Sequence, residues 1–225
     1  MNIKTQVFIH KNVAIEIFPM VLSFGRNLLK KSKKINKYQL SLREVFGLCV
    51  LSEFRTFLNA DNKWVFTTEK QISDDGAVAI MDNTNKIIYY EKIEQVYLPG
   101  CYLKRDVYQS MNDYILNYIN KSKNNGSEYE ADQSLFVLSD IKSENFNDIF
   151  EWKDFVKKFF KNYHFLHLYF LTLTKHSRKS NEYYFLSFTN QKHRQHLNGE
   201  FKFEVRAEGF FNFKCLQKIN LMKKI

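Results

Sequence analysis

The chain has 225 residues, 44% of them hydrophobic and 16% aromatic, so it can bury a sizeable core and is not a disordered polymer. Lys and Arg exceed Asp and Glu by 34 − 24 = 10, and this positive charge favours polyanionic partners, with nucleic acid ahead of an anionic membrane surface. The three cysteines form no CxxC pair, which argues against a disulfide framework or a structural zinc site. No uncharged run approaches the roughly 20 residues that cross a bilayer, so we expect a cytoplasmic protein without a membrane partner.

The N-terminal part of the chain combines apolar runs with a basic stretch. Residues 3–24 contain two apolar runs, which predict a hairpin or a pair of short strands. Residues 26–37, RNLLKKSKKINK, carry six cations. This pattern predicts either a solvated basic loop or a segment that contacts phosphates. The cations assigned here to nucleic-acid binding are Arg26, Lys30, Lys31, Lys33 and Lys34.

Residues 41–59 give the clearest helical pattern. Ser41 with Glu44 three positions later is typical of a capping box at a helix start. At about 100° per residue the apolar side chains gather on one side, and Glu44 falls opposite them. Glu53 falls within the apolar side, where a carboxylate needs a cationic partner, a raised pKa or a metal ion.

Three strands are predicted next, at residues 63–67, 77–81 and 86–98. The second strand follows the sequence Asp74-Asp75-Gly76, and the turn at residues 82–85 joins it to the third. The third strand begins as an apolar run and then fills with charge at Glu91, Lys92 and Glu94. The alternatives are an exposed strand face with ion pairs across strands, and a metal site on the sheet.

The rest of the chain alternates helices and strands. Residues 105–122 and 147–163 are amphipathic, and residues 134–138 form an apolar run typical of a strand buried on both faces. Strands are predicted at 166–174, 183–189 and 201–205, the first two joined as a hairpin. The connections between these strands carry cations that we also assign to nucleic-acid binding: Lys175, Arg178, Lys179, Lys192 and Arg194.

The order from residue 41 to 138 is helix, strand, strand, strand, helix, strand. This order resembles the common core of the restriction-endonuclease-like, or PD-(D/E)xK, nuclease superfamily. In that superfamily an acid on the first helix, an Asp at the head of the second strand and a Glu-x-Lys on the third strand converge on Mg²⁺. The resemblance implies that the catalytic residues are Glu53, with Glu44 as the alternative helix acid, Asp75, Glu91, Lys92 and Glu94.

The resemblance also implies a Mg²⁺ or Mn²⁺ cofactor, because hard divalent cations take oxygen ligands. The implied metal ligands are Asp75, Glu91 and Glu94. The motif departs from the superfamily pattern, since Glu91 and the adjacent Lys92 should point to opposite faces of the strand. Three alternatives stay open: Glu94 binds the metal with support from Lys92, a bulge near Glu91 re-aims a side chain, or activity is lost and a nuclease-like binding platform is retained.

The fold class predicted from these elements is α/β (α+β), a central mixed sheet flanked by helices, with a restriction-endonuclease-like α-β-β-β-α-β core and extra C-terminal strands. We predict a single domain over residues 1–225. The nuclease-like core covers about 41–140, and the N-terminal strands 3–24 and the C-terminal helix and strands 147–215 are extensions.

The function expected from the resemblance is a Mg²⁺-dependent DNA endonuclease of restriction or mobile-element type, with RNA as the alternative substrate. It would act as a homodimer or as a subunit of a nuclease complex. The alternative function is a non-catalytic nucleic-acid-binding or assembly protein on a nuclease-like fold, and a third, less favoured, is an enzyme that attacks a base or glycosidic bond without metal. His193 and His196 lie in a basic polar stretch without a nearby cysteine, which favours a solvated loop over a zinc site.

Overall fold

The computed structural model describes residues 9–10, 18–24, 37–67, 75–99, 110–122, 133–140, 149–177, 179–190, 198–206 and 212–218. Its helices are α1 (Phe18–Phe24), α3 (Lys37–Leu58), α4 (Met111–Ser122) and α5 (Ile149–Asn162). Its strands are β1 (Ile9–His10), β2 (Lys63–Thr67), β3 (Ala77–Met81), β4 (Ile87–Leu98), β5 (Gln133–Ser139), β6 (His167–His176), β7 (Ser180–Thr189), β8 (Gly199–Arg206) and β9 (Lys214–Lys218).

The strands form one mixed sheet in which the spatial order follows the chain from β1 to β9. The strands β4, β5 and β6 run parallel to one another, and α4 and α5 lie in the two connections between them. All other neighbouring strands are antiparallel. The α+β class and the mixed sheet flanked by helices are therefore confirmed.

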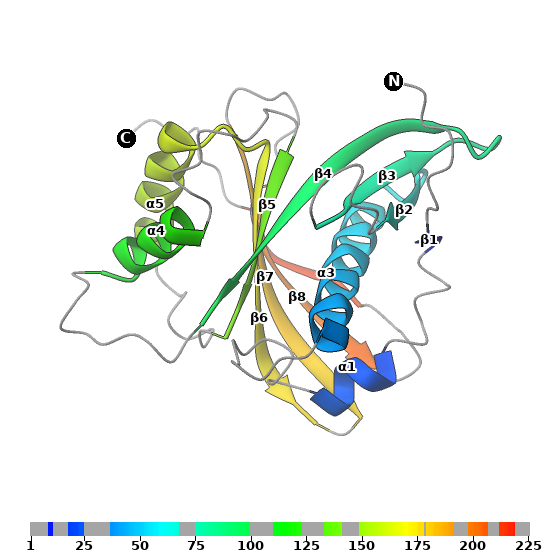
Figure 1. The fold of residues 1–225 in the computed structure, drawn as a ribbon, viewed down its shortest axis with the longest axis horizontal. Coiled ribbons are helices and arrows are strands. Elements are labelled where there is room, and N and C mark those ends of the chain that lie inside the picture. The colour runs from blue at the N-terminus through cyan, green and yellow to red at the C-terminus, as the bar shows by residue number, and fades with distance from the viewer. Residues whose placement is uncertain are drawn as a thin grey trace.

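Helices cover both faces of this sheet, as Figure 1 shows, with α3 on one side and α4 and α5 on the other. The α3 layer buries Phe46, Val50 and Phe54 against aromatic side chains of the C-terminal strands. The opposite layer is built around Trp152 and Phe155 of α5. Because β5 is covered on both faces, six of its seven residues are buried and its sequence is a continuous apolar run.

The hairpin between β3 and β4 follows the predicted turn chemistry. The Asp82 carboxylate accepts hydrogen bonds from the backbone N–H groups of Thr84 and Lys86, at 2.8 and 2.9 Å. Asn85 takes the left-handed conformation with φ 60°, which Asn tolerates better than most residues. The local sequence thus fixes the register in which β4 returns along β3.

Two predicted elements need correction. Residues 18–24 were expected to end a strand pair, but they form α1, with Pro19 in the first helical turn, where its missing N–H costs nothing. The α3 helix begins at Lys37 and not at Ser41, so Ser41 lies inside the helix and is not its cap. Residues Lys37–Leu40 contain no helix breaker, which allows the earlier start.

Candidate functional site

The two faces of β4 carry different side chains. Ile93 packs in the core beneath α3, whereas Val96 and Leu98 pack in the core beneath α4 and α5. By alternation, Glu91 shares the α3 face with Ile93, and Lys92 and Glu94 share the face with Val96. Pairing with β3 is continuous through Tyr89–Lys92, and the shift in register falls at Ile80/Met81, so this stretch does not contain the bulge near Glu91 that was one of the three alternatives.

Glu91 lies in a buried polar cluster between α3 and the sheet. Its side chain is 0% exposed, and Oε2 accepts a short hydrogen bond and ion pair from Nη2 of Arg55. Its Oε1 accepts a hydrogen bond of 3.1 Å from the Tyr169 hydroxyl, which in turn accepts one of 2.8 Å from Arg55. We call Arg55, Glu91 and Tyr169 the Glu91 cluster.

The negative charge of Glu91 is balanced within the cluster by the positive charge of Arg55. Burial alone would raise the pKa of Glu91, but the attraction of Arg55 outweighs it and holds the pKa below its ordinary value. Burial raises the pKa of Tyr169 well above its ordinary value, so its hydroxyl stays protonated and can donate to Glu91. Both oxygens of Glu91 are thus used within the core, and the structure places this predicted metal ligand in a structural ion pair.

Asp75 contacts β4 at Gln95, four residues further along the strand than Glu91. Ala77 pairs with Lys92, and the N–H of Ile93 donates to the carbonyl of Gly76 at 2.9 Å, where β3 is only beginning. One step further along, the N–H of Gln95 donates to Oδ2 of Asp75 at 2.6 Å. The carboxylate therefore continues the ladder that β3 leaves unfinished. Gly76 makes this possible, because its φ of 124° is a conformation that other residues rarely adopt.

The side chain of Gln95 links the same point to α3. Its Nε2 donates to the backbone carbonyl of Glu44 at 3.1 Å. Its Oε1 has no hydrogen-bond partner among the described residues and lies where a side chain on Gly47 would begin, 2.6 Å from an ideal Cβ. Gln95 therefore brings Asp75 and the N-terminal half of α3 together on β4. The helix acid whose backbone Gln95 contacts is Glu44, the alternative in the sequence prediction.

Arg43 completes this group from α3. Its guanidinium carbon lies 4.0 Å from the ring centroid of Tyr97, the next residue after Gln95 on the α3 face of β4. Arg43 is 7% exposed, and burial lowers the pKa of its guanidinium, although the negative charge of Glu44 acts in the opposite direction. We call Arg43, Glu44, Asp75, Gln95 and Tyr97 the Gln95 cluster.

The other predicted site residues lie elsewhere. Glu53 is half-buried on α3, nine residues or roughly 13 Å along the helix from Glu44. Lys92 and Glu94 lie on the α4 and α5 face of the sheet, where Glu94 is 5% exposed. Within the described ranges, no three His, Cys, Asp or Glu side chains come together as a group that could hold a metal ion.

The predicted nucleic-acid contacts are only partly within the described residues. The basic segment from Arg26 to Lys34, and Arg178, Lys192 and Arg194, lie outside them. Lys175 and Lys179 lie at the exposed tip of the β6–β7 hairpin.

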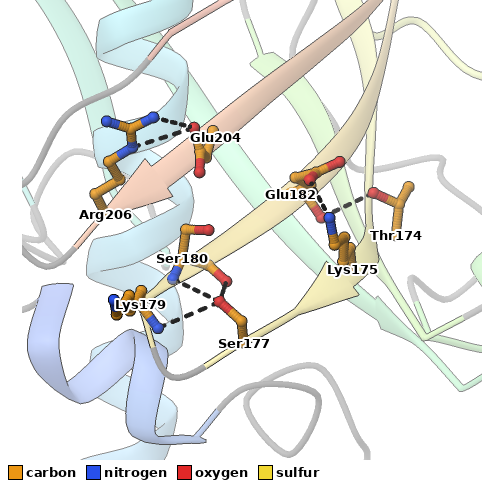
Figure 2. A network of polar contacts seen from close by, with 8 residues as sticks. All are labelled: Thr174, Lys175, Ser177, Lys179, Ser180, Glu182, Glu204 and Arg206. Carbon is orange, nitrogen blue, oxygen red and sulfur yellow. Dashed lines mark hydrogen bonds and ion pairs between the residues drawn. The ribbon is translucent and has the colours of Figure 1, made fainter.

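Figure 2 shows this tip, where Lys175 pairs with Glu182 at 3.2 Å and the Ser177 hydroxyl accepts from the N–H of Lys179. Arg206 on the neighbouring strand pairs with Glu204 at 2.9 Å. These pairs are exposed to solvent, so they are weak and can exchange their carboxylates for other anions.

Sequence reasoning missed Arg43, Arg55, Gln95 and Tyr97. A period-two reading of β4 does place Gln95 and Tyr97 on one face with Glu91, so that part of the site was accessible. The roles of Arg43 and Arg55 could not be predicted from the sequence. Their partners lie 36 or more residues away, and only the packing of α3 on the sheet brings them together.

In comparisons with known proteins, no family model and no curated protein sequence matches this chain. None of the helices within the described ranges has the length and apolarity needed to cross a membrane.

Proposed function

We propose that the protein is a Mg²⁺- or Mn²⁺-dependent DNA endonuclease of restriction or mobile-element type, with its site at the Gln95 cluster. The observation that carries the proposal is the hydrogen bond from the N–H of Gln95 to the Asp75 carboxylate. It holds an acid from the head of β3 against β4, at the point where Gln95 also contacts Glu44. The backbone of an acidic residue on the first helix and the carboxylate of Asp75, before the second strand, thus both contact Gln95 on the third strand.

The arrangement of elements supports the same proposal. The segment α3-β2-β3-β4-α4-β5 has the order of the nuclease core named above, and α3 and α4 lie on opposite faces of the sheet. The Gln95 cluster lies near the carboxyl end of β4, and ligands of open sheets with parallel strands commonly bind beyond such ends.

The donor set fits a hard divalent cation. Asp75 would supply a carboxylate and Gln95 an amide oxygen that has no hydrogen-bond partner among the described residues, and Glu44 is the candidate for a second carboxylate. All three are oxygen ligands, the type that Mg²⁺ and Mn²⁺ prefer. A cation held there would polarise the scissile phosphate and lower the pKa of the attacking water. Hydrolysis then adds water across one P–O bond and leaves one phosphate end and one hydroxyl end.

The remaining residues have positioning roles in this proposal. Gln95 orients Asp75 through its backbone and α3 through its amide, and the Glu91 cluster fixes α3 on the sheet about four residues away along β4. The tip cations Lys175 and Lys179 extend beyond the carboxyl ends of β4 and β5, where they would contact the backbone of a bound duplex.

The direct test is incubation of purified protein with supercoiled and linear DNA, with Mg²⁺ or with EDTA. The proposal predicts nicked or linear product only with the metal. Full cleavage in EDTA, or none on any DNA with Mg²⁺ or Mn²⁺, contradicts it.

One observation favours the second function, a nucleic-acid-binding protein without catalysis. The only lysine of β4, Lys92, lies on the face opposite Gln95, so the strand places no amine beside Asp75. This function predicts salt-sensitive DNA binding without cleavage.

A further inference from the structure

Two arginines of α3 are almost completely buried, and they differ in what surrounds them. Arg55 is 5% exposed and its Nη2 donates to a carboxylate and to a hydroxyl, although its Nε has no hydrogen-bond partner among the described residues. Arg43 is 7% exposed, and its Nε has no hydrogen-bond partner among the described residues. Burying a cationic group with an unused donor is unfavourable, so Arg43 calls for an acceptor that the described residues do not supply.

The position of Arg43 restricts what that acceptor can be. One face of the guanidinium is covered by the Tyr97 ring, at 4.0 Å from carbon to ring centroid. Stacking leaves the edge of the planar group, with its fork of N–H donors, for an anion in the same plane. Such a fork matches a carboxylate or phosphate oxygen pair.

The neighbours of Arg43 make a phosphodiester the fitting anion. Glu44 follows it on α3, and the backbone carbonyl of Glu44 accepts a hydrogen bond from Gln95, whose N–H donates to the Asp75 carboxylate. Two carboxylates beside the site disfavour an acidic protein segment, whereas a nucleic-acid phosphate can share the acids through a divalent cation.

We infer that Arg43, stacked on Tyr97, binds a backbone phosphate of nucleic acid at the Gln95 cluster. This inference rests on the proposed site and adds a ligand contact to it. It also supplies, from the helix, a cation on the face of β4 that carries Gln95, where the strand itself has none.

The test measures DNA binding with Ca²⁺ as the divalent cation, which takes oxygen ligands, by fluorescence anisotropy of a labelled duplex over a range of salt concentrations. Arg43→Gln removes the charge at similar volume and is expected to weaken binding about tenfold. It should also reduce the slope of log K against log salt by about 0.9, the value for one phosphate contact. The matched control is Lys157→Ala, which removes an exposed cation of α5 on the other face of the sheet.

The folding of each variant is checked by thermal unfolding. If Arg43→Gln does not fold, Arg43→Lys becomes the decisive variant, since lysine retains the charge but loses the fork and the stack. We expect it to bind several-fold more weakly with an unchanged salt slope. Folded Arg43→Gln with the affinity and slope of the parent, or Arg43→Lys with the parent's affinity, overturns the inference.

The outcomes separate this inference from the proposed nuclease. DNA binding that depends on Arg43, without cleavage under any metal, supports the inference and overturns the nuclease. Cleavage that depends on Asp75, with DNA binding that does not change in Arg43 variants, supports the nuclease and overturns the inference. A parent protein that does not bind DNA overturns both.

Discussion

Arg55 of α3 and Glu91 of β4 form a buried ion pair that is separated by 36 positions in sequence and shielded from solvent on both sides. Tyr169 of β6 bonds to both partners, so the pair joins the helix to two strands of the sheet. A helix fixed at this point lies along β4 with Glu44 beside Gln95, which is the contact on which the proposed site depends.

Removing one member of this pair should destabilise the protein strongly. Arg55→Met leaves Glu91 charged, buried and unpaired, and Glu91→Leu leaves Arg55 in the same state, so each should cost about 3–5 kcal/mol in the free energy of unfolding. The double variant Arg55→Met/Glu91→Leu should recover much of that loss. Urea unfolding of all four proteins measures this cycle. Additive losses in the cycle would contradict the ion pair.

Acid should weaken the fold through Glu91. The folded-state pKa of Glu91 lies below its ordinary value of 4.5 because of Arg55, so the unfolded state binds the proton more readily. Its stabilising contribution is therefore complete above about pH 5 and is lost as pH falls through the depressed folded pKa. Unfolding free energies measured from pH 7 to pH 3 should fall more steeply for the parent than for Arg55→Met/Glu91→Leu. Parallel curves would show that Glu91 does not titrate as described.

Gly47 should tolerate no side chain while Gln95 is present. An added Cβ would lie 2.6 Å from Oε1 of Gln95 and 3.0 Å from Cε1 of Phe136, so Gly47→Ala must displace the amide. We expect a net loss of about 1–3 kcal/mol in unfolding free energy, although alanine is the better helix former.

The control for this clash is a second substitution. Gln95→Ala removes the obstructing amide, so Gly47→Ala should cost much less in that background. An equal cost in both backgrounds would mean that Gln95 does not fill the space beside Gly47.

The β6–β7 tip should contribute to DNA affinity through charge alone. Lys175→Ala/Lys179→Ala removes two exposed cations, and each lost phosphate contact should lower the salt slope by about 0.9. The thermal stability should change little, because the Lys175–Glu182 pair is exposed. Lys157→Ala/Lys158→Ala on α5 is the matched control of equal charge. Equal slopes for the two double variants would remove the tip from the interface.

The sequence predicted the strands around Asp75 well because their signals are local. The bounds of β2 and β3, and the Asp82 turn, follow from apolar runs broken by turn residues. The alternation of β4 was also readable, and it placed Glu91 and Lys92 on opposite faces as the structure has them.

What the sequence could not supply were the partners across layers. The charge at Glu91 looked like a metal ligand because the adjacent Lys92 points to the opposite face of the strand and cannot neutralise it there. Its counter-ion is on a helix 36 positions earlier, and only tertiary packing brings the two together. Likewise the sequence could not show that Gln95 contacts the backbone of Glu44, because that contact depends on how α3 lies along β4, where Gln95 also fills the space beside Gly47.

The central claim, a metal-dependent nuclease site built on Asp75, is tested most directly by plasmid cleavage in Mg²⁺ with the parent, Asp75→Asn and Asp61→Asn. Asp61 is exposed in the loop before β2, so its variant controls for the loss of one surface carboxylate. The account predicts that Asp75→Asn, folded by its thermal transition, loses at least about 100-fold in cleavage rate while Asp61→Asn cuts at the parental rate. Cleavage by folded Asp75→Asn at the parental rate would contradict it.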